Sequence, residues 1–193
     1  MLSHEEKRQL LLSARQAIDG ALNRAPAVDP PPRLPGLMQR CGLFVTLKLA
    51  GQLRGCIGYI ESQQPLYDTI GEIAVKSALE DPRFAPLTDE ELSRCTIQLS
   101  ILSPLRRIHG VEEITIGTHG LLLEVGPQRG LLLPQVAVEF QWEPKAFLEA
   151  TARKAGLHRA AWQDRDAKIY VFTAEIIDES EMPDGRSRQS PPG

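Results

Sequence analysis

The apolar positions near the N-terminus recur every three to four residues, which predicts an amphipathic helix with one face to bury. Ser3 followed by Glu6 is a capping-box pattern and predicts that the helix begins there. Five prolines between Pro26 and Pro35 end the helix and predict an extended connector. The apolar face of this helix consists of Leu10, Leu11, Ala14, Ile18, Ala21 and Leu22.

After the connector, apolar and polar residues alternate from Leu43 to Leu49, so the pattern repeats every two residues. This alternation predicts a strand. Gly51-Gln52 predicts a hairpin turn into a second strand over residues 53–57. The segment Gly55–Gly58 is then expected where that second strand ends.

The rest of the chain mixes helices with hairpin-like pairs of strands, which predicts an α+β fold with mainly antiparallel sheets. Helices are expected after Pro65 (ended by Asp81-Pro82), after the capping box Thr88–Glu91, and from Pro144 to Gly156. Strands are expected over residues 96–102, 121–125, 131–133 and 169–177, with residues 126–130 as a connecting turn. After Ser180 the sequence is rich in Pro, Gly, Ser and charge, which predicts a disordered tail.

Composition and charge narrow the class of protein. The 193 residues, 42% of them hydrophobic, suffice for one large domain or two small ones with a real core. A net charge of −3 provides no overall field for DNA or acidic lipid, so neither nucleic acid nor membrane is an expected partner. The charged N-terminus does not resemble a signal peptide and no apolar run reaches the length of a membrane span. We therefore expect a cytoplasmic protein.

Common cofactor and metal motifs are missing from the sequence. It contains neither a phosphate-binding Gly-x-x-x-x-Gly-Lys-Ser/Thr loop nor a dinucleotide-binding glycine fingerprint. The three cysteines, Cys41, Cys56 and Cys95, are odd in number and widely spaced, which fits neither a disulfide framework nor a zinc site. No cofactor and no metal are predicted.

The segment Leu53-Arg54-Gly55-Cys56-Ile57-Gly58 carries the most chemistry. Glycines at two of six positions allow unusual backbone angles or a close approach of other atoms. Residues two apart on a strand share a face, so Arg54 and Cys56 can point into one pocket, where a guanidinium favours the thiolate. Cysteine is equally at home as a small buried apolar residue, so the segment also fits a purely structural role.

This hexapeptide resembles the signature of the AMMECR family, found in prokaryotes as protein A of the AmmeMemoRadiSam system. Further segments resemble the family in the same order, and the resemblance covers about residues 7–178. They are Gly42-Leu43-Phe44-Val45-Thr46-Leu47, Asp81-Pro82-Arg83-Phe84-Ala85-Pro86-Leu87, Gly117-Thr118-His119-Gly120-Leu121, Leu133-Pro134-Gln135-Val136-Ala137, Trp142 and Lys154-Ala155-Gly156-Leu157.

The resemblance implies an α+β domain over residues 3–179 with two interlocked subdomains, the smaller expected around residues 60–112, and a tail over 180–193. The system's name implies two partners, a Memo-like protein similar to metal-dependent dioxygenases and a radical SAM enzyme. The chain lacks the Cys-x-x-x-Cys-x-x-Cys pattern of the radical SAM partner, so it is not that component.

The family motifs also imply a set of site residues: Arg54, Cys56, Asp81, Arg83, Phe84 and His119. We expect Arg54 and Arg83, with Gly55 and Gly58, to form a cleft for a small anionic group. Cys56 is then the nucleophile or redox-active thiol, with His119 as its base or hydrogen-bond partner. Each residue also has a structural reading: Arg83 pairs with Asp81, Phe84 packs in the core, and the ring of His119 binds the backbone of a turn.

Three functional hypotheses follow. The protein is an enzyme, or an enzyme component, that acts through Cys56 on a small or peptide-borne anionic substrate. Alternatively, it is a non-catalytic module that presents substrate to, or regulates, a Memo-like or radical SAM partner. In the third, the hexapeptide is structural and function resides elsewhere. Replacement of Cys56 by alanine or serine distinguishes the first from the second.

Overall fold

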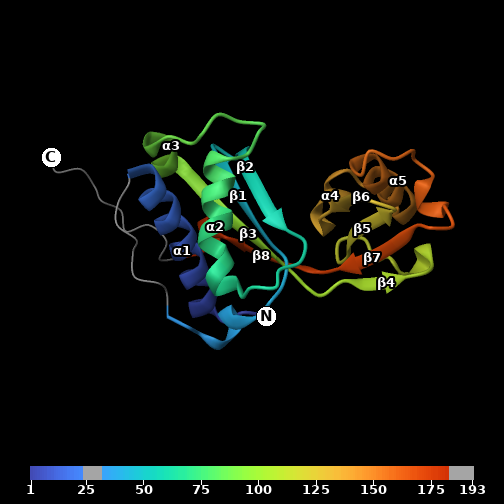
Figure 1. Ribbon diagram of the computed structural model, residues 1–193, viewed down its shortest axis with the longest axis horizontal. Coiled ribbons are helices and arrows are strands. Elements are labelled where there is room, and N and C mark those ends of the chain that lie inside the picture. Colours follow the sequence, from blue (N-terminus) through green and yellow to red (C-terminus); the bar gives the residue numbers. More distant parts are fainter. Residues whose placement is uncertain (24–31, 183–193) are drawn as a thin grey trace. The chain divides into compact units, whose positions relative to one another are not determined.

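The computed structural model describes residues 1–23 and 32–182, and these form two compact units (Figure 1). Of the described residues, 1–23, 32–101 and 175–182 form the first unit, and Leu102–Ala174 forms the second. A smaller subdomain is expected from the sequence around residues 60–112, whereas residues 60–101 supply a helix and a central strand to the core of the first unit.

Parts of two expected features lie outside the described residues. One part is residues 26–31 of the proline-rich connector, whereas Pro35 of the same connector begins a short 3-10 helix, Pro35–Met38. Residues 183–193 of the predicted tail also lie outside it. The beginning of that tail has a defined conformation, because Glu179–Glu181 forms a 3-10 turn.

Helices pack against one face of a four-stranded sheet in the first unit (Figure 1). The sheet has the order β2-β1-β3-β8 and consists of β1 (Leu43–Leu49), β2 (Gln52–Tyr59), β3 (Cys95–Leu102) and β8 (Ala174–Asp178). The helices are α1 (His4–Asn23), α2 (Leu66–Leu79) and the short α3 (Asp89–Arg94). As the capping patterns predict, Ser3 and Glu6 bond each other ahead of α1, and Thr88 and Glu91 form a capping box at α3.

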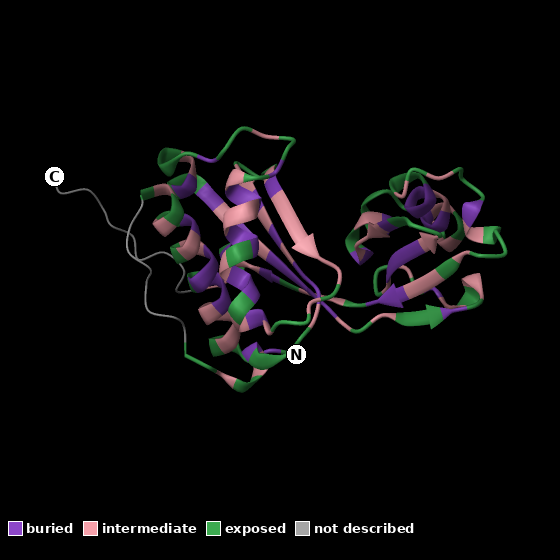
Figure 2. Cartoon of the chain, viewed as in Figure 1, coloured by how far each residue is buried: buried purple, intermediate pink, exposed green. Residues whose placement is uncertain are grey.

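Alternation along the strands divides the sheet into an apolar face and a mixed face. Leu43, Val45 and Leu47 of β1 are buried in one core with Ile97 and Leu99 of β3 and the apolar face of α1. In Figure 2 the helices of this unit carry buried residues interspersed with exposed ones. The spacing of apolar residues in the sequence therefore predicted this layer correctly.

The β1–β2 hairpin differs from the expectation in two respects. Its turn lies at Ala50-Gly51, where both residues have positive φ (50° and 80°), one position earlier than predicted. The second strand continues to Tyr59, so Gly55–Gly58 lies within β2 and not at its end. The prediction that the motif follows the strand was wrong, because Ile57 and Gly58 still pair with β1.

The second unit has its own four-stranded sheet, in the order β4-β7-β5-β6. It contains β4 (Arg106–Ile108), β5 (Gly120–Val125), β6 (Gln128–Leu132) and β7 (Lys168–Phe172), with helices α4 (Pro134–Glu139) and α5 (Pro144–Lys154). Leu121 and Val171 pack with Phe147 and Leu148 of α5 in a separate core. Helices combined with two antiparallel sheets confirm the predicted α+β class.

One predicted strand is in fact two. Residues 169–177 read as a single apolar strand, but β7 ends at Phe172 and β8 begins at Ala174 in the other sheet. Strand β4 and helix α4 were not predicted, because three and six residues are too few to establish a period. Among the described residues, no helix has the length and apolar character needed to cross a membrane.

Candidate functional site

The loop after α2 covers the free edge of strand β2 at Cys56. The backbone N–H of Cys56 donates to Asp81 Oδ2 at 2.8 Å, and Arg83 Nη2 donates to the carbonyl oxygen of Cys56 at 3.3 Å. These two side chains occupy the positions that a neighbouring strand would otherwise take. Both the N–H and the carbonyl oxygen of Cys56 are therefore hydrogen-bonded to side chains of this loop.

Asp81 and Arg83 form a close ion pair within this loop. Asp81, only 5% exposed, accepts from the backbone N–H, Nε and Nη2 of Arg83 at 3.1, 2.9 and 2.7 Å. The Arg83 guanidinium holds the pKa of Asp81 well below its usual range, although burial acts in the opposite direction. The Arg83–Asp81 pair that was expected if Arg83 has a structural role is thus present. About half of the Arg83 side chain (51%) stays exposed.

Arg54 is likewise paired with a carboxylate. Its Nε and Nη2 bind the two oxygens of Glu91 at 2.9 Å each, and its side chain is only 13% exposed. The hydrogen bonds from Arg54, and then from the Thr88 backbone, lower the pKa of Glu91 to about 2. The sequence predicts only the capping role of Glu91. No local pattern indicates its bond to Arg54, because 37 residues separate the two.

A β-bulge explains the direction of the Arg54 side chain. Leu47 pairs with Gly55, but the next residue, Lys48, pairs with Leu53, so Arg54 is the extra residue on β2. The guanidinium carbons of Arg54 and Arg83 lie 5.9 and 5.5 Å from the centre of the Phe84 ring. Phe84 is partly exposed and contacts both arginines of the site, so it is not a core residue of this unit.

The sulfur of Cys56 lies at the end of a polar row on the face of the sheet opposite the helices. Thr46 stands directly across from Cys56 and its hydroxyl donates to Sγ at 3.2 Å. Gln98 stands across from Thr46 on β3 and donates to Asp178 of β8 at 2.9 Å, while Lys48 Nζ lies 3.7 Å from Asp178. No sequence pattern predicts this row, because its residues come together only through the pairing of four strands.

Gly55 and Gly58 meet a packing requirement. A Cβ on Gly55 would lie 2.1 Å from the carbonyl oxygen of Ser77 in α2, and one on Gly58 would lie 2.4 Å from that of Leu43. Ser77 also accepts a hydrogen bond from the Ile57 N–H through its hydroxyl, at 3.0 Å. The glycines therefore allow α2 and β1 to approach β2 closely, and this holds Cys56 in place.

His119 lies in the second unit, whereas Cys56 lies in the first. The Thr115 N–H donates to His119 Nδ1 at 3.0 Å, and the His119 N–H donates back to the Thr115 carbonyl at 2.9 Å. Because Nδ1 accepts, this contact assigns the proton of the neutral ring to Nε2. The turn interaction considered for His119 is thus present, and its action as a base for Cys56 stays a prediction.

The other two thiols have different surroundings from Cys56. Cys95 is completely buried, and burial is the main cause that raises the pKa of its thiol. Burial raises the pKa of the half-buried Cys41 thiol to about 11. Both environments disfavour the thiolate, which makes these two cysteines internal standards for the behaviour of Cys56.

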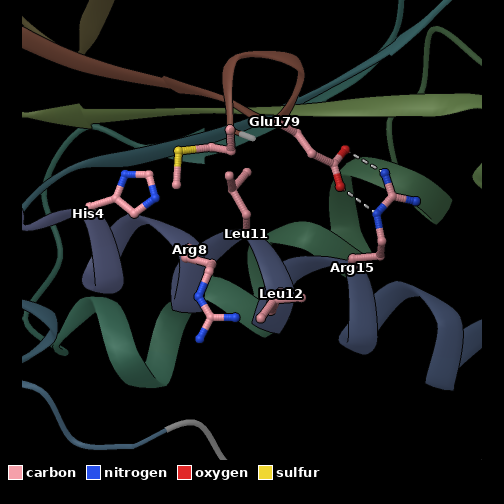
Figure 3. A pocket seen from close by; sticks show the side chains of 7 residues that line it. His4, Arg8, Leu11, Leu12, Arg15 and Glu179 are labelled. Atoms are coloured by element: carbon pink, nitrogen blue, oxygen red, sulfur yellow. Dashed lines mark hydrogen bonds and ion pairs between the residues drawn. The ribbon is translucent and has the colours of Figure 1, made fainter. Parts of the chain in front are cut away.

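A small pocket lies between α1 and the C-terminal turn of the first unit (Figure 3). Leu11, Leu12 and Met182 line it, and the Arg15–Glu179 ion pair stands at one end. Its volume of about 40 Å³ suits water, not a substrate. Within residues 1–23 and 32–182, no group of three His, Cys, Asp or Glu side chains is placed to hold a metal ion.

Comparison with known proteins places the chain in a family. The AMMECR1 family model matches residues 11–177. A protein of Methanothermobacter thermautotrophicus is 42% identical over 92% of this chain and 96% of its own length, and one of Thermococcus gammatolerans is 41% identical over 94% of each. The crystal structure of the uncharacterized protein PH0010 from Pyrococcus horikoshii superposes with a TM-score of 0.84 at 39% identity, covering 96% of this chain and 97% of that one. The chain belongs to the AMMECR1 family.

Proposed function

We propose that the protein is a component of an AmmeMemoRadiSam modification system and acts through the thiol of Cys56, together with a Memo-like protein and a radical SAM enzyme. One observation carries the proposal: Asp81 and Arg83 hold the backbone of Cys56 at both polar groups, while its side chain stays only partly buried. A catalytic group must be held in this manner to keep a productive geometry.

Polar groups on two sides orient Cys56. The Thr46 hydroxyl donates a hydrogen bond to Sγ at 3.2 Å. The Arg83 guanidinium, which binds the carbonyl oxygen of Cys56, supplies a positive charge beside the same residue. Cys56 is therefore suited to nucleophilic attack.

Arg83 offers the contact for an anionic group of the substrate. Its Nε and Nη2 are occupied by Asp81 and Cys56, while Nη1 has no partner among the described residues. Because Asp81 compensates the positive charge, Arg83 supplies directed hydrogen bonds more than net charge. Arg54 is mostly buried and bound to Glu91, so its role is to stabilise the loop between α2 and α3. The substrate is then a small or peptide-borne molecule with one acceptor group close to the atom attacked.

Alkylation of the folded protein with iodoacetamide across a range of pH tests the proposal. Intact mass counts the modified thiols, and peptide mapping identifies them. We expect Cys56 to react before Cys41 and Cys95, because burial raises the pKa of those two thiols. If Cys56 stays inert until denaturant is added, the thiol does not carry the function.

A non-catalytic binding module is the second candidate, and an exposed apolar patch in the second unit favours it. Val138 and Phe140 are 55% and 58% exposed, and the Phe140 ring stacks on Trp142 with centroids 4.9 Å apart. Exposed aromatic residues of this kind are typical of partner-binding surfaces. Under this alternative, Cys56→Ser leaves the reconstituted system active, while Phe140→Asp abolishes binding of the Memo-like or radical SAM partner. Under the thiol proposal the serine variant is inactive.

A further inference from the structure

Three cations of the second unit line one cleft. Arg107 comes from β4, Lys168 begins β7, and Arg165 lies in the loop before it. The cleft has a volume of about 500 Å³, which is within the range of about 300–1,000 Å³ typical of small-molecule sites. We name it the cationic cleft.

The register of the sheet brings two of these cations together. Arg107 stands opposite Tyr170, and Lys168 lies two residues before Tyr170 on the same strand. Residues two apart share a face, so Arg107 and Lys168 are diagonal neighbours. Ile108 points the other way into the core. Arg107 and Lys168 are thus both exposed on one face of the sheet.

The charges around the cleft do not cancel. No ion pair or side-chain hydrogen bond joins the charged group of any of the three cations to another described residue. Two carboxylates line the cleft, Glu124 and Asp166, and Glu124 is already bound by Arg129. Arg54 and Arg83 of the hexapeptide site, by contrast, each have their own carboxylate. The positive charge of this cleft is not compensated by carboxylates and is therefore available to an anion. The charges of Arg54 and Arg83 are already compensated by Glu91 and Asp81.

We infer that the cationic cleft binds a small soluble molecule that carries a phosphate or pyrophosphate group. A single guanidinium satisfies a planar carboxylate through two parallel hydrogen bonds. Three cations from two segments, β4 and the chain around the start of β7, match instead the several oxygens of a tetrahedral group. The inference is independent of Cys56, because every residue that carries it lies in the second unit.

Isothermal titration calorimetry of the full chain with sodium pyrophosphate, at low and at physiological salt, is the test. We expect saturable one-site binding, weakened by about tenfold or more in Arg107→Glu and in Lys168→Glu. Arg153→Glu on α5 is the matched control, since Arg153 is exposed in the same unit and the net charge changes equally. It should change the Kd by less than about twofold at physiological salt. Asp166→Asn should tighten binding, because it removes the uncompensated carboxylate.

Several results would overturn the inference. One is the absence of saturable binding at millimolar pyrophosphate, and another is an equal loss in Arg153→Glu, which would indicate a general charge effect. Succinate binding as tightly as pyrophosphate would refute the choice of phosphate. Binding to phosphatidic-acid vesicles without binding of pyrophosphate would refute a soluble ligand. If a charge-reversal variant fails to fold by circular dichroism, Arg107→Gln and Lys168→Gln provide the same comparison.

Discussion

Replacing Asp81 by alanine should destabilise the first unit, and the structure sets the magnitude. The change leaves the N–H of Cys56 without its acceptor, which costs about 1–3 kcal/mol for a buried group. It also removes the ion pair with Arg83, but half of that side chain is exposed and water replaces much of the interaction, so about 0.5–1 kcal/mol is lost. We expect a total loss of about 1.5–4 kcal/mol in the free energy of unfolding.

The loss should depend on pH in a defined direction. The pKa of Asp81 lies well below its ordinary value in the folded protein, so its carboxylate stabilises the fold at pH values above about 4. That contribution disappears as the pH falls from about 5 toward the folded pKa. The difference between wild type and Asp81→Ala should therefore be full at pH 6 and smaller at pH 3.

Urea unfolding followed by circular dichroism at pH 6 and pH 3 measures both effects. Glu80→Ala is the matched control, because Glu80 is the exposed neighbour whose side chain has no partner among the described residues. It should change the free energy of unfolding by less than about 0.5 kcal/mol. A loss below about 1 kcal/mol in Asp81→Ala, or an equal loss at both pH values, would show that the carboxylate of Asp81 does not stabilise the loop on the edge of β2.

Three further predictions concern other contacts. Gly55→Ala should lower the free energy of unfolding in urea by about 2–3 kcal/mol, because the new Cβ would meet a carbonyl oxygen of α2. The control Gly20→Ala should be neutral or stabilising, because no atom lies within 4 Å of its Cβ position. Equal effects of the two substitutions would contradict this packing. Thr46→Val should change the rate of Cys56 alkylation at a fixed pH, because it removes the hydrogen bond to Sγ, while Thr46→Ser restores the rate; an unchanged rate in Thr46→Val would exclude the hydroxyl contact. Glu179→Ala should lose about 2 kcal/mol, since the partly buried Arg15 loses its carboxylate and the Ile97 N–H loses its acceptor; near-wild-type urea stability would show that the C-terminal turn is not anchored.

The sequence alone determined the local elements and the family. Period-two alternation over residues 43–49 and helical spacing after Ser3 led to the correct strand and helix, because each pattern reflects burial of one face. Capping boxes located the starts of α1 and α3, since those bonds form within one turn. The hexapeptide and the segments around it were sufficient to recognise the AMMECR family.

Only the tertiary structure decided what these residues contact. Glu91 lies 37 positions from Arg54, and Asp81 lies 25 from Cys56, so no local period relates them. The polar row that ends at Cys56 depends on the register of strands, and a shift by one residue would turn Thr46 to the other face. The division of residues 169–177 between two sheets was equally hidden, because both halves bury apolar side chains and differ only in their partners. Sequence patterns record which side chains are buried, whereas pairing across the fold determines which charges are compensated and which remain available to a ligand.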